Sequence, residues 1–260
     1  MKTVVVLSLA RSGSSLLAGI LHRLGIYMGS AKDLILGTHV NKYGNYENQD
    51  FFKLSAKILY HADCYTIGWA HIPDDEKVKA SVERFKDWMK RVIRENEREL
   101  WGWKDGTSIY TIPYMEKYLT NPYYIVLQRD VESCVRSHLK AAKMSEWWKT
   151  VRYMTRYFSL KNLGGMGWGI LKTLILRGNF FNNKDLYRQV ILDGHSRMDA
   201  FVKGRKHINV EFLEVIKKPQ ETINRIIKFL DITPSPSRLQ WALKFIDRDE
   251  VHFSKKPVKN

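Results

Sequence analysis

The run Arg11-Ser12-Gly13-Ser14-Ser15 has the composition of an anion-binding turn. It lies between an apolar stretch that suits a strand and a pattern that suits a helix. A turn of small residues leading into a helix points several backbone N–H groups at one spot. The helix dipole adds positive potential there, so the spot binds phosphate or sulfate, with Arg11 and the serine hydroxyls as further donors. The alternative is an ordinary helix start, in which Ser14 or Ser15 serves only as the N-cap.

This turn is not a Walker A motif, GxxxxGK[ST], in which the lysine reaches the β and γ phosphates of a nucleotide. Ser14 stands where that lysine belongs, and the basic residue Arg11 precedes the glycine. The sequence therefore disfavours an ordinary kinase that uses Mg²⁺ and a nucleoside triphosphate. A phosphoryl-transfer enzyme of the wider P-loop class remains an alternative interpretation.

A second candidate anion ligand is Arg129, which follows the apolar run Tyr123–Gln128. A helical pattern comes next, and Ser137 lies eight residues beyond Arg129, two turns into that helix. An arginine at the end of a strand can bind a phosphate with both arms of its guanidinium. The alternative is a surface ion pair between Arg129 and Asp130 or a glutamate.

These two segments, in this order, resemble the sulfotransferases that use 3′-phosphoadenosine 5′-phosphosulfate (PAPS) and release adenosine 3′,5′-bisphosphate (PAP). In that family, a strand–loop–helix reading RSG[ST][ST] binds the 5′-phosphosulfate. A later strand that ends in arginine, with a serine eight residues beyond, binds the 3′-phosphate. The resemblance implies that Arg129 and Ser137 hold the 3′-phosphate. It also implies that the 5′-phosphosulfate is held by Arg11, Ser12, Gly13, Ser14, Ser15 and the backbone of Leu16.

Three more stretches resemble a bacterial, carbohydrate-sulfotransferase-like branch of that family. They are Gly44-Asn45-Tyr46-Glu47-Asn48, Trp101-Gly102-Trp103-Lys104-Asp105, and Val210-Glu211-Phe212-Leu213 with the helix that starts at Pro219. The similarity at Phe245-Ile246-Asp247 is weaker, and the whole resemblance covers residues 3–140 and 205–253. The chain departs from the family pattern at Ala10, Val131 and Gly106-Thr107-Ser108. Residues 141–184 match no part of it.

The resemblance implies sulfuryl transfer to an acceptor hydroxyl, which needs a general base and positive charge near the leaving phosphate. Lys104 and Arg11 are the candidates for that charge, and Glu47 is the candidate base. Glu47 has an alternative role as an acid that complements the dipole of a helix over residues 48–59. No metal is expected, because cationic side chains can take the place of Mg²⁺ and no metal-ligand cluster is evident in the sequence. The other candidate bases are His39 and Asp105.

Four short apolar runs suit buried parallel strands, because continuous β-branched and aromatic runs are typical of a sheet covered on both faces. They are Thr3–Leu9, Leu100–Lys104, Tyr123–Gln128 and His207–Phe212. Helical patterns lie between them. This alternation predicts an α/β fold, a P-loop-like three-layer α/β/α sandwich with a central parallel sheet. Ligands of such sheets bind beyond the carboxyl ends of the strands, where the candidate residues lie.

Apolar periodicity predicts three of the helices. One covers Ser14–Leu24 and ends at Gly25, a residue suited to the left-handed position after a helix. A longer helix runs over Val78–Ile93, and a third starts at Pro219, since the first turn of a helix tolerates proline. No repeat or linker divides the chain. Residues 1–260 are therefore predicted to form a single domain, with residues 141–184 as a helical insert or lid.

The composition is that of a globular protein, with 260 residues, 44% of them hydrophobic, and a formal net charge of +16. Disordered, collagenous and disulfide-scaffold chains are excluded, and the two cysteines, Cys64 and Cys134, favour a reducing compartment. No run approaches the ~20 apolar residues of a membrane span. The apolar N-terminus is interpreted as a strand rather than a secretory signal. We therefore expect a cytoplasmic protein, with peripheral membrane association as an alternative.

The positive charge predicts acidic partners, and half of it lies in residues 140–184, which hold nine basic residues and one acidic residue. Aromatic residues are interleaved over residues 144–181. This segment is interpreted as a helical subdomain, as a lid over the acceptor, or as a segment that docks on an anionic membrane surface. The expected partner is a hydroxyl acceptor, a small molecule or a saccharide of glycan or glycolipid type. No nucleic-acid module is recognised, and a non-enzymatic binder of polyanions or membrane surfaces is a further alternative.

Overall fold

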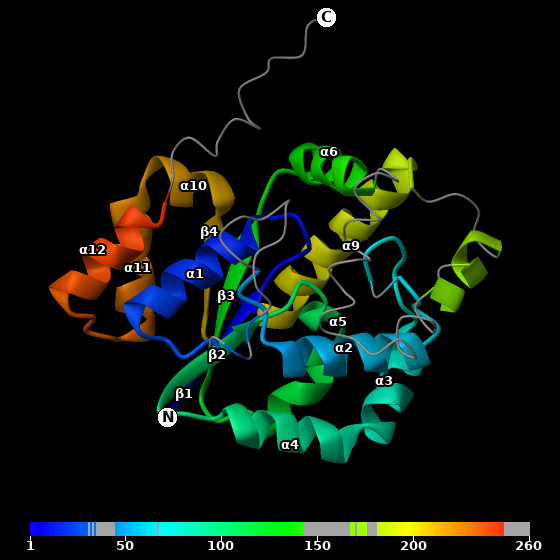
Figure 1. Ribbon diagram of the computed structural model, residues 1–260, viewed down its shortest axis with the longest axis horizontal. Helices are drawn as coiled ribbons and strands as arrows, with labels where there is room; N and C mark the ends of the chain where they lie inside the picture. The colour runs from blue at the N-terminus through cyan, green and yellow to red at the C-terminus, as the bar shows by residue number, and fades with distance from the viewer. Residues whose placement is uncertain are drawn as a thin grey trace, which may run out of the picture.

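The computed structural model describes residues 1–30, 32, 34, 45–66, 68–142, 167–169, 171–175 and 181–246. A parallel sheet lies at its centre, with the strand order β2-β1-β3-β4 (Figure 1). The strands are β1 (Lys2–Leu7), β2 (Leu100–Lys104), β3 (Pro122–Gln128) and β4 (His207–Glu211). The predicted α/β fold class with a central parallel sheet is confirmed, and the four predicted strands differ from the observed ones only at their ends.

Helices cover both faces of this sheet (Figure 1). They are α1 (Ser14–Leu24), α2 (Gln49–His61), α3 (Asp75–Arg84), α4 (Lys86–Asn96), α5 (Ser108–Met115), the 3₁₀ turn η1 (Glu116–Tyr118), α6 (Val131–Ala142), α9 (Lys184–Val202), α10 (Phe212–Lys217), α11 (Pro219–Leu230) and α12 (Pro236–Lys244). Helices α1, α10, α11 and α12 share a hydrophobic cluster with one face of the sheet. Helices α2 to α6 and α9 share another with the opposite face. These layers confirm the predicted three-layer sandwich.

The strands bury alternate side chains in opposite directions, as the two-residue period of an extended chain requires. In β1, Val4 and Val6 face the layer of α1, whereas Val5 and Leu7 face the layer of α2. All four side chains are fully buried. Because both faces are covered, neither set is polar, and this explains why the strands are readable in the sequence as continuous apolar runs.

Two strands end earlier than predicted. The predicted first strand reaches Leu9, but β1 ends at Leu7. The carbonyl of Leu9 accepts hydrogen bonds from the N–H (3.3 Å) and the hydroxyl (2.7 Å) of Ser12, so the chain turns there instead of extending the sheet. The last strand ends at Glu211 because Phe212 begins α10.

The predicted helices have different outcomes. Helix α1 has the predicted bounds and ends at Gly25, which has a φ of 108°, and α11 begins at Pro219 as predicted. The prediction of a single helix over Val78–Ile93 is wrong. The structure has two helices there, α3 and α4, which meet at Phe85, a residue with a φ of −103° and a ψ of 15°. The ring of Phe85 packs against His61 of α2, with ring centroids 5.1 Å apart. The apolar spacing continues across this break, so periodicity alone does not reveal it.

The strand order identifies where a ligand is expected to bind. From β1 the chain crosses to β2 on one side, and from β3 it crosses to β4 on the other. Such a reversal opens a crevice beyond the carboxyl ends of the two central strands, and ligands of open α/β sheets bind in it. The residues that follow β1 and β3 include Arg11 and Arg129, so both lie at this crevice.

The predicted insert or lid over residues 141–184 falls largely outside the described residues, and so does its interpretation as a membrane-docking segment. Within the described part of it, Trp168, Leu171 and Ile175 are exposed. None of the helices in the described ranges is long and apolar enough to cross a bilayer. The organisation of residues 1–260 as a single domain stays a prediction.

Candidate functional site

Two residues in left-handed conformations shape the turn from β1 to α1, namely Arg11 (φ 67°) and Gly13 (φ 93°). Gly13 is the N-cap of α1, and a Cβ atom at this position would lie 2.2 Å from the ring of Phe212. Only glycine fits both the backbone conformation and the space. No side chain caps α1, so the interpretation of Ser14 or Ser15 as an ordinary N-cap is wrong.

Three backbone N–H groups at this turn have no acceptor among the described residues: those of Gly13, Ser14 and Ser15. The N–H groups of Ser12 and Leu16 donate to Leu9 (3.3 Å) and Gly13 (3.0 Å), so they are not available as the resemblance implied. The hydroxyl of Ser12 also donates to Leu9 and shapes the turn. What remains is three consecutive donors at the positive end of an 11-residue helix, an arrangement that binds an anion.

The segment after β3 meets this turn. The Nε of Arg11 donates to the hydroxyl oxygen of Ser137 on α6 at 3.1 Å, and the Nη1 of Arg129 donates to the carbonyl of Arg11 at 3.4 Å. The guanidinium of Arg129 also lies over the ring of Phe212, 4.7 Å from its centroid. Asp130 does not pair with Arg129. It accepts a hydrogen bond from the N–H of Ser133 at 2.8 Å and so caps α6.

Arg11 and Arg129 place two positive charges close together. Neither guanidinium is paired with a carboxylate in the part of the chain that the structure describes. Burial, followed by the charge of Arg129, lowers the pKa of Arg11. Desolvated like charges are unfavourable, and a bound anion with several negative oxygens relieves that cost. Arg11 and Arg129 are 118 positions apart in the sequence, and the segments that contain them meet to form one cationic site.

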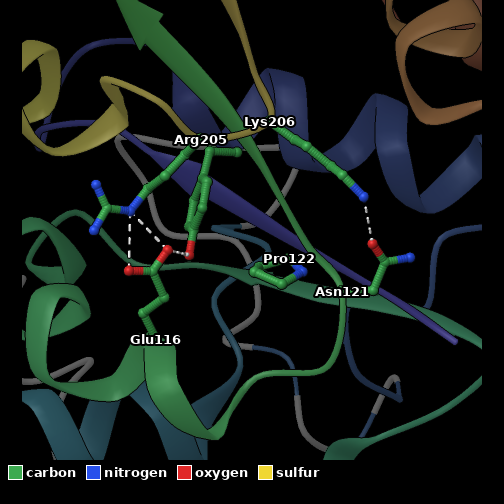
Figure 2. Close-up of a pocket in the computed structure, with 6 residues that line it drawn as sticks. Glu116, Asn121, Pro122, Arg205 and Lys206 are labelled. Carbon is green, nitrogen blue, oxygen red and sulfur yellow. Dashed lines mark hydrogen bonds and ion pairs between the residues drawn. The ribbon is translucent and has the colours of Figure 1, made fainter.

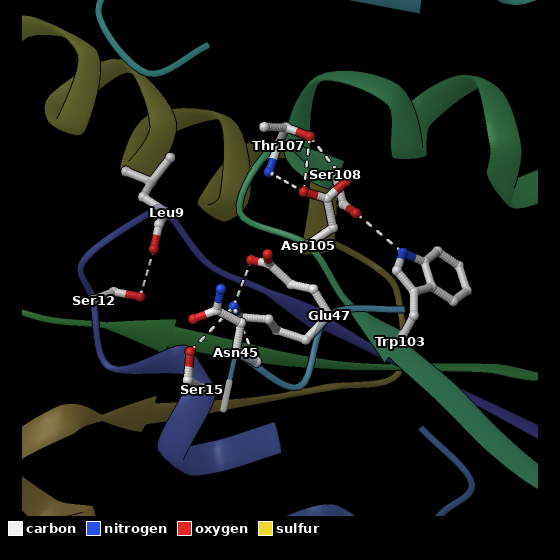
Figure 3. Close-up of polar contacts among 10 residues, drawn as sticks. Leu9, Ser12, Ser15, Asn45, Glu47, Trp103, Asp105, Thr107 and Ser108 are labelled. Carbon is white, nitrogen blue, oxygen red and sulfur yellow. Dashed lines mark hydrogen bonds and ion pairs between the residues drawn. The ribbon is translucent and has the colours of Figure 1, made fainter. Parts of the chain in front are cut away.

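Lys104, the last residue of β2, connects this turn to Glu47. Its Nζ donates to the Oε1 of Glu47 at 2.7 Å, to the carbonyl of Asn45 at 3.3 Å and to the hydroxyl of Ser15 at 3.4 Å. Figure 3 shows Glu47, Asn45 and Ser15 around this nitrogen. The side chains of Lys104 and Glu47 are only 5% and 17% exposed, so the ion pair is largely shielded from water. Glu47 precedes Asn48, the N-cap of α2, and its carboxylate contacts Lys104.

Asp105, another candidate base, is bound to its own turn. Its carboxylate accepts hydrogen bonds from the N–H (3.0 Å) and the hydroxyl (2.9 Å) of Thr107 at the start of α5 (Figure 3). Asp105 is 1% exposed. Burial, followed by the negative charge of Glu47, raises its pKa to about 6. The third candidate, His39, lies outside the described residues.

The raised pKa of Asp105 predicts a pH-dependent stability. Between about pH 4 and pH 6, the folded protein binds more protons at Asp105 than the unfolded chain, so stability falls as pH rises through this window. Relative to Asp105→Asn, the wild type is expected to lose up to about 3 kcal/mol of unfolding free energy from pH 4 to pH 7. Urea unfolding at several pH values measures this difference. Asp87→Asn, at an exposed position on α4, is the control, and parallel pH profiles for the wild type and Asp105→Asn would contradict the prediction.

Two residues of this site received no role from the sequence. Phe212 packs against Gly13 and lies under Arg129, and His138 lies within hydrogen-bond distance of the Ala10 carbonyl, at 3.2 Å. The signal for Phe212 is its position at the carboxyl end of β4, beside the other strand ends. The signal for His138 is its position next to Ser137.

A separate hollow lies at the amino end of β3, with a volume of about 290 Å³ (Figure 2). Its charged groups have partners: Arg205 donates to Glu116 at 2.7 Å, and Lys206 donates to Asn121 at 2.8 Å. It lies at the opposite end of the strands from the cationic site. These paired groups give it no evident ligand chemistry. Its lining is Glu116, Asn121, Pro122, Tyr124, Arg205 and Lys206.

No model of a known protein family matches the chain, and no curated protein matches it. The solved structures that are similar to it include two sulfotransferase domains. The sulfotransferase domain from the curacin biosynthetic pathway has 18% sequence identity and a TM-score of 0.49, over 91% of this chain and 76% of that chain. The sulfotransferase domain from the Synechococcus PCC 7002 olefin synthase has 14% identity and a TM-score of 0.47, over 100% of this chain and 90% of that one. At these sequence identities and TM-scores, the similarity does not assign an activity to the chain.

Proposed function

We propose that this chain is a sulfotransferase that moves the sulfuryl group of PAPS to an acceptor hydroxyl. The observation that carries the proposal is the meeting of Arg11, Arg129 and Ser137 beyond the carboxyl ends of β1 and β3, with no carboxylate on either guanidinium in the described ranges. Such a site suits a ligand with more than one anionic group. PAPS has two, a 3′-phosphate and a 5′-phosphosulfate.

Each half of the site fits one of these groups. The N–H groups of Gly13, Ser14 and Ser15, which have no acceptor among the described residues, suit the 5′-phosphosulfate together with Arg11. Arg129 and the hydroxyl of Ser137 suit the 3′-phosphate. These residues bind and orient the nucleotide, and that positioning together with fixed positive charge is expected to supply much of the rate.

The proposal assigns the transfer step to Lys104 and Glu47, which are joined by a hydrogen bond of 2.7 Å. When bound, PAPS would supply the sulfuryl group: its sulfur would form a bond to the acceptor oxygen as the bond to the 5′-phosphate oxygen breaks, and PAP would leave. Lys104, hydrogen-bonded to Ser15 at the start of α1, is placed to neutralise charge on the leaving phosphate. It also orients Glu47 through Oε1, while Oε2 has no partner among the described residues and can accept the proton of the acceptor hydroxyl.

The acceptor is proposed as a hydroxyl of a small molecule, glycan or glycolipid. The net charge of +16 supports an acidic or membrane-associated acceptor. The same charge supports the alternative of a polyanion binder without enzymatic activity. A cytoplasmic location is part of the proposal. Binding of PAP distinguishes the alternatives, because only a PAPS enzyme needs a site for the 3′-phosphate.

The proposal predicts that PAP binds about 10- to 100-fold more tightly than ADP, which lacks the 3′-phosphate. Arg129→Ala is expected to weaken PAP binding by a similar factor and to weaken ADP binding much less, because ADP lacks the 3′-phosphate that Arg129 is proposed to bind. Calorimetry at two salt concentrations measures both. Arg91→Ala, which removes an exposed charge from α4, is the matched control. Equal binding of the two nucleotides, unaffected by Arg129→Ala, would overturn the proposal, and a steep salt dependence with no nucleotide preference would favour the polyanion binder.

A further inference from the structure

His138 is a buried residue of α6 that takes no part in the chemistry proposed above. It is 2% exposed, and its Nε2 lies 3.2 Å from the carbonyl oxygen of Ala10, 128 positions earlier in the chain. A carbonyl oxygen only accepts hydrogen bonds, so Nε2 carries the hydrogen and the ring is the Nε2–H tautomer. This hydrogen bond joins α6 to the turn between β1 and α1.

Aromatic contacts from two other segments hold the His138 ring in place. It stacks on Tyr187 of α9, with ring centroids 5.2 Å apart and planes 16° apart, and its centroid lies 5.6 Å from that of Trp69. Its Nδ1 has no hydrogen-bond partner in the part of the chain that the structure describes. Burial, followed by the charge of Arg11, lowers the pKa of His138 to about 3, so the ring stays neutral. A fixed, neutral imidazole is suited to donate a hydrogen bond to a backbone carbonyl. It is poorly suited to act as a general acid or base.

The residue after Ala10 has a backbone conformation that needs support. Arg11 has a φ of 67°, which is unfavourable for a residue with a Cβ atom unless its surroundings hold it. Hydrogen bonds hold the carbonyls on both sides of that φ: Ala10 accepts from His138, and Arg11 accepts from Arg129. In this conformation the Nε of Arg11 reaches Ser137, the residue next to His138.

We propose that His138 is a positioning residue for the nucleotide: its hydrogen bond to Ala10 keeps Arg11 in the left-handed conformation that aims its guanidinium at Ser137. This inference rests on the proposed function and adds a residue that does not touch the ligand. It follows that the two halves of the site form together, because one helix, α6, supplies both a ligand of the 3′-phosphate half and the support of the 5′-phosphosulfate half. Loss of the support releases Arg11 and weakens both halves.

The test compares two side chains of nearly equal length and shape. His138→Gln keeps an N–H donor near the position of Nε2, whereas His138→Met has none. Calorimetry is expected to give a Kd for PAP about tenfold higher in His138→Met than in the wild type, and within about threefold of the wild type in His138→Gln. Tyr187→Phe is the control, since it keeps the stacked ring and removes a hydroxyl that has no partner among the described residues. A purely structural role would affect the glutamine and methionine variants alike.

A second measurement is made on the wild-type protein. Nitrogen chemical shifts of the imidazole in the wild-type protein, assigned by comparison with His138→Gln, are expected to show the Nε2–H tautomer, with exchange of that hydrogen slowed further by PAP. An Nδ1–H tautomer or a charged ring at pH 7 would overturn the inference, as would equal PAP affinity in His138→Met and the wild type. Failure of the wild type to bind PAP would instead overturn the proposed function, and this inference with it.

Discussion

Replacement of Glu47 by glutamine is expected to lower the turnover number by about 10²- to 10⁴-fold, the range typical of a lost general base. The amide cannot take the proton of the acceptor hydroxyl, but it still offers an oxygen to Lys104, which also keeps its bonds to Asn45 and Ser15. The fold and the cationic site are therefore expected to persist, and PAP should bind with nearly unchanged affinity. Turnover of labelled PAPS with an acceptor, and calorimetry with PAP, measure the two quantities.

Glu99→Gln supplies the matched control, because it makes the same chemical change at an exposed position before β2. Its turnover is expected to equal that of the wild type. Full activity in Glu47→Gln would exclude Glu47 as the general base and leave Asp105 and His39 as the candidates. A loss of PAP binding equal to the loss of turnover would show that Glu47 acts through the nucleotide site instead.

Lys104→Met is expected to lower turnover by about 10²- to 10³-fold, because it removes a preorganised positive charge from the leaving phosphate. It also leaves the Glu47 carboxylate without its cation at a site where that carboxylate is 17% exposed. Removal of one partner from a shielded ion pair, with the other left charged, lowers the free energy of unfolding by about 3 kcal/mol. Thermal unfolding and turnover, measured on the same preparation, report the two effects.

The double variant Glu47→Gln/Lys104→Met separates the effects on catalysis and on folding. It removes both charges, so its stability is expected to recover most of what Lys104→Met loses. Its turnover is expected to stay at or below that of Lys104→Met. Recovery of turnover together with stability would show that Lys104 serves folding only.

Much of the fold was predictable because its signals are local. The four strands are continuous apolar runs, and a sheet buried on both faces requires such runs. The pairing of Arg11 with Arg129 was predictable because both follow strands of one parallel sheet, and the carboxyl ends of those strands share an edge. The sequence did not predict that only the N–H groups of Gly13, Ser14 and Ser15 lack an acceptor among the described residues. That outcome depends on which N–H groups form hydrogen bonds within the turn.

What the sequence missed depends on contacts between distant residues. The break at Phe85 does not interrupt the apolar spacing, and the ring of Phe85 packs against His61 on another helix. The hydrogen bond from His138 to Ala10 spans 128 positions. A lone histidine in a helix has no spacing that marks such a role, so only the folded arrangement reveals it.

The contact between Phe212 and Gly13 also bears on how the site assembles during synthesis of the chain. The turn between β1 and α1 is made among the first residues, yet the ring that packs against it and lies under Arg129 comes from the last fifth of the sequence. A nascent chain that has not reached β4 carries every side chain proposed to hold the nucleotide but lacks one wall of the site. We therefore expect nucleotide binding to begin only after β4 has been made, because Phe212 supplies that wall.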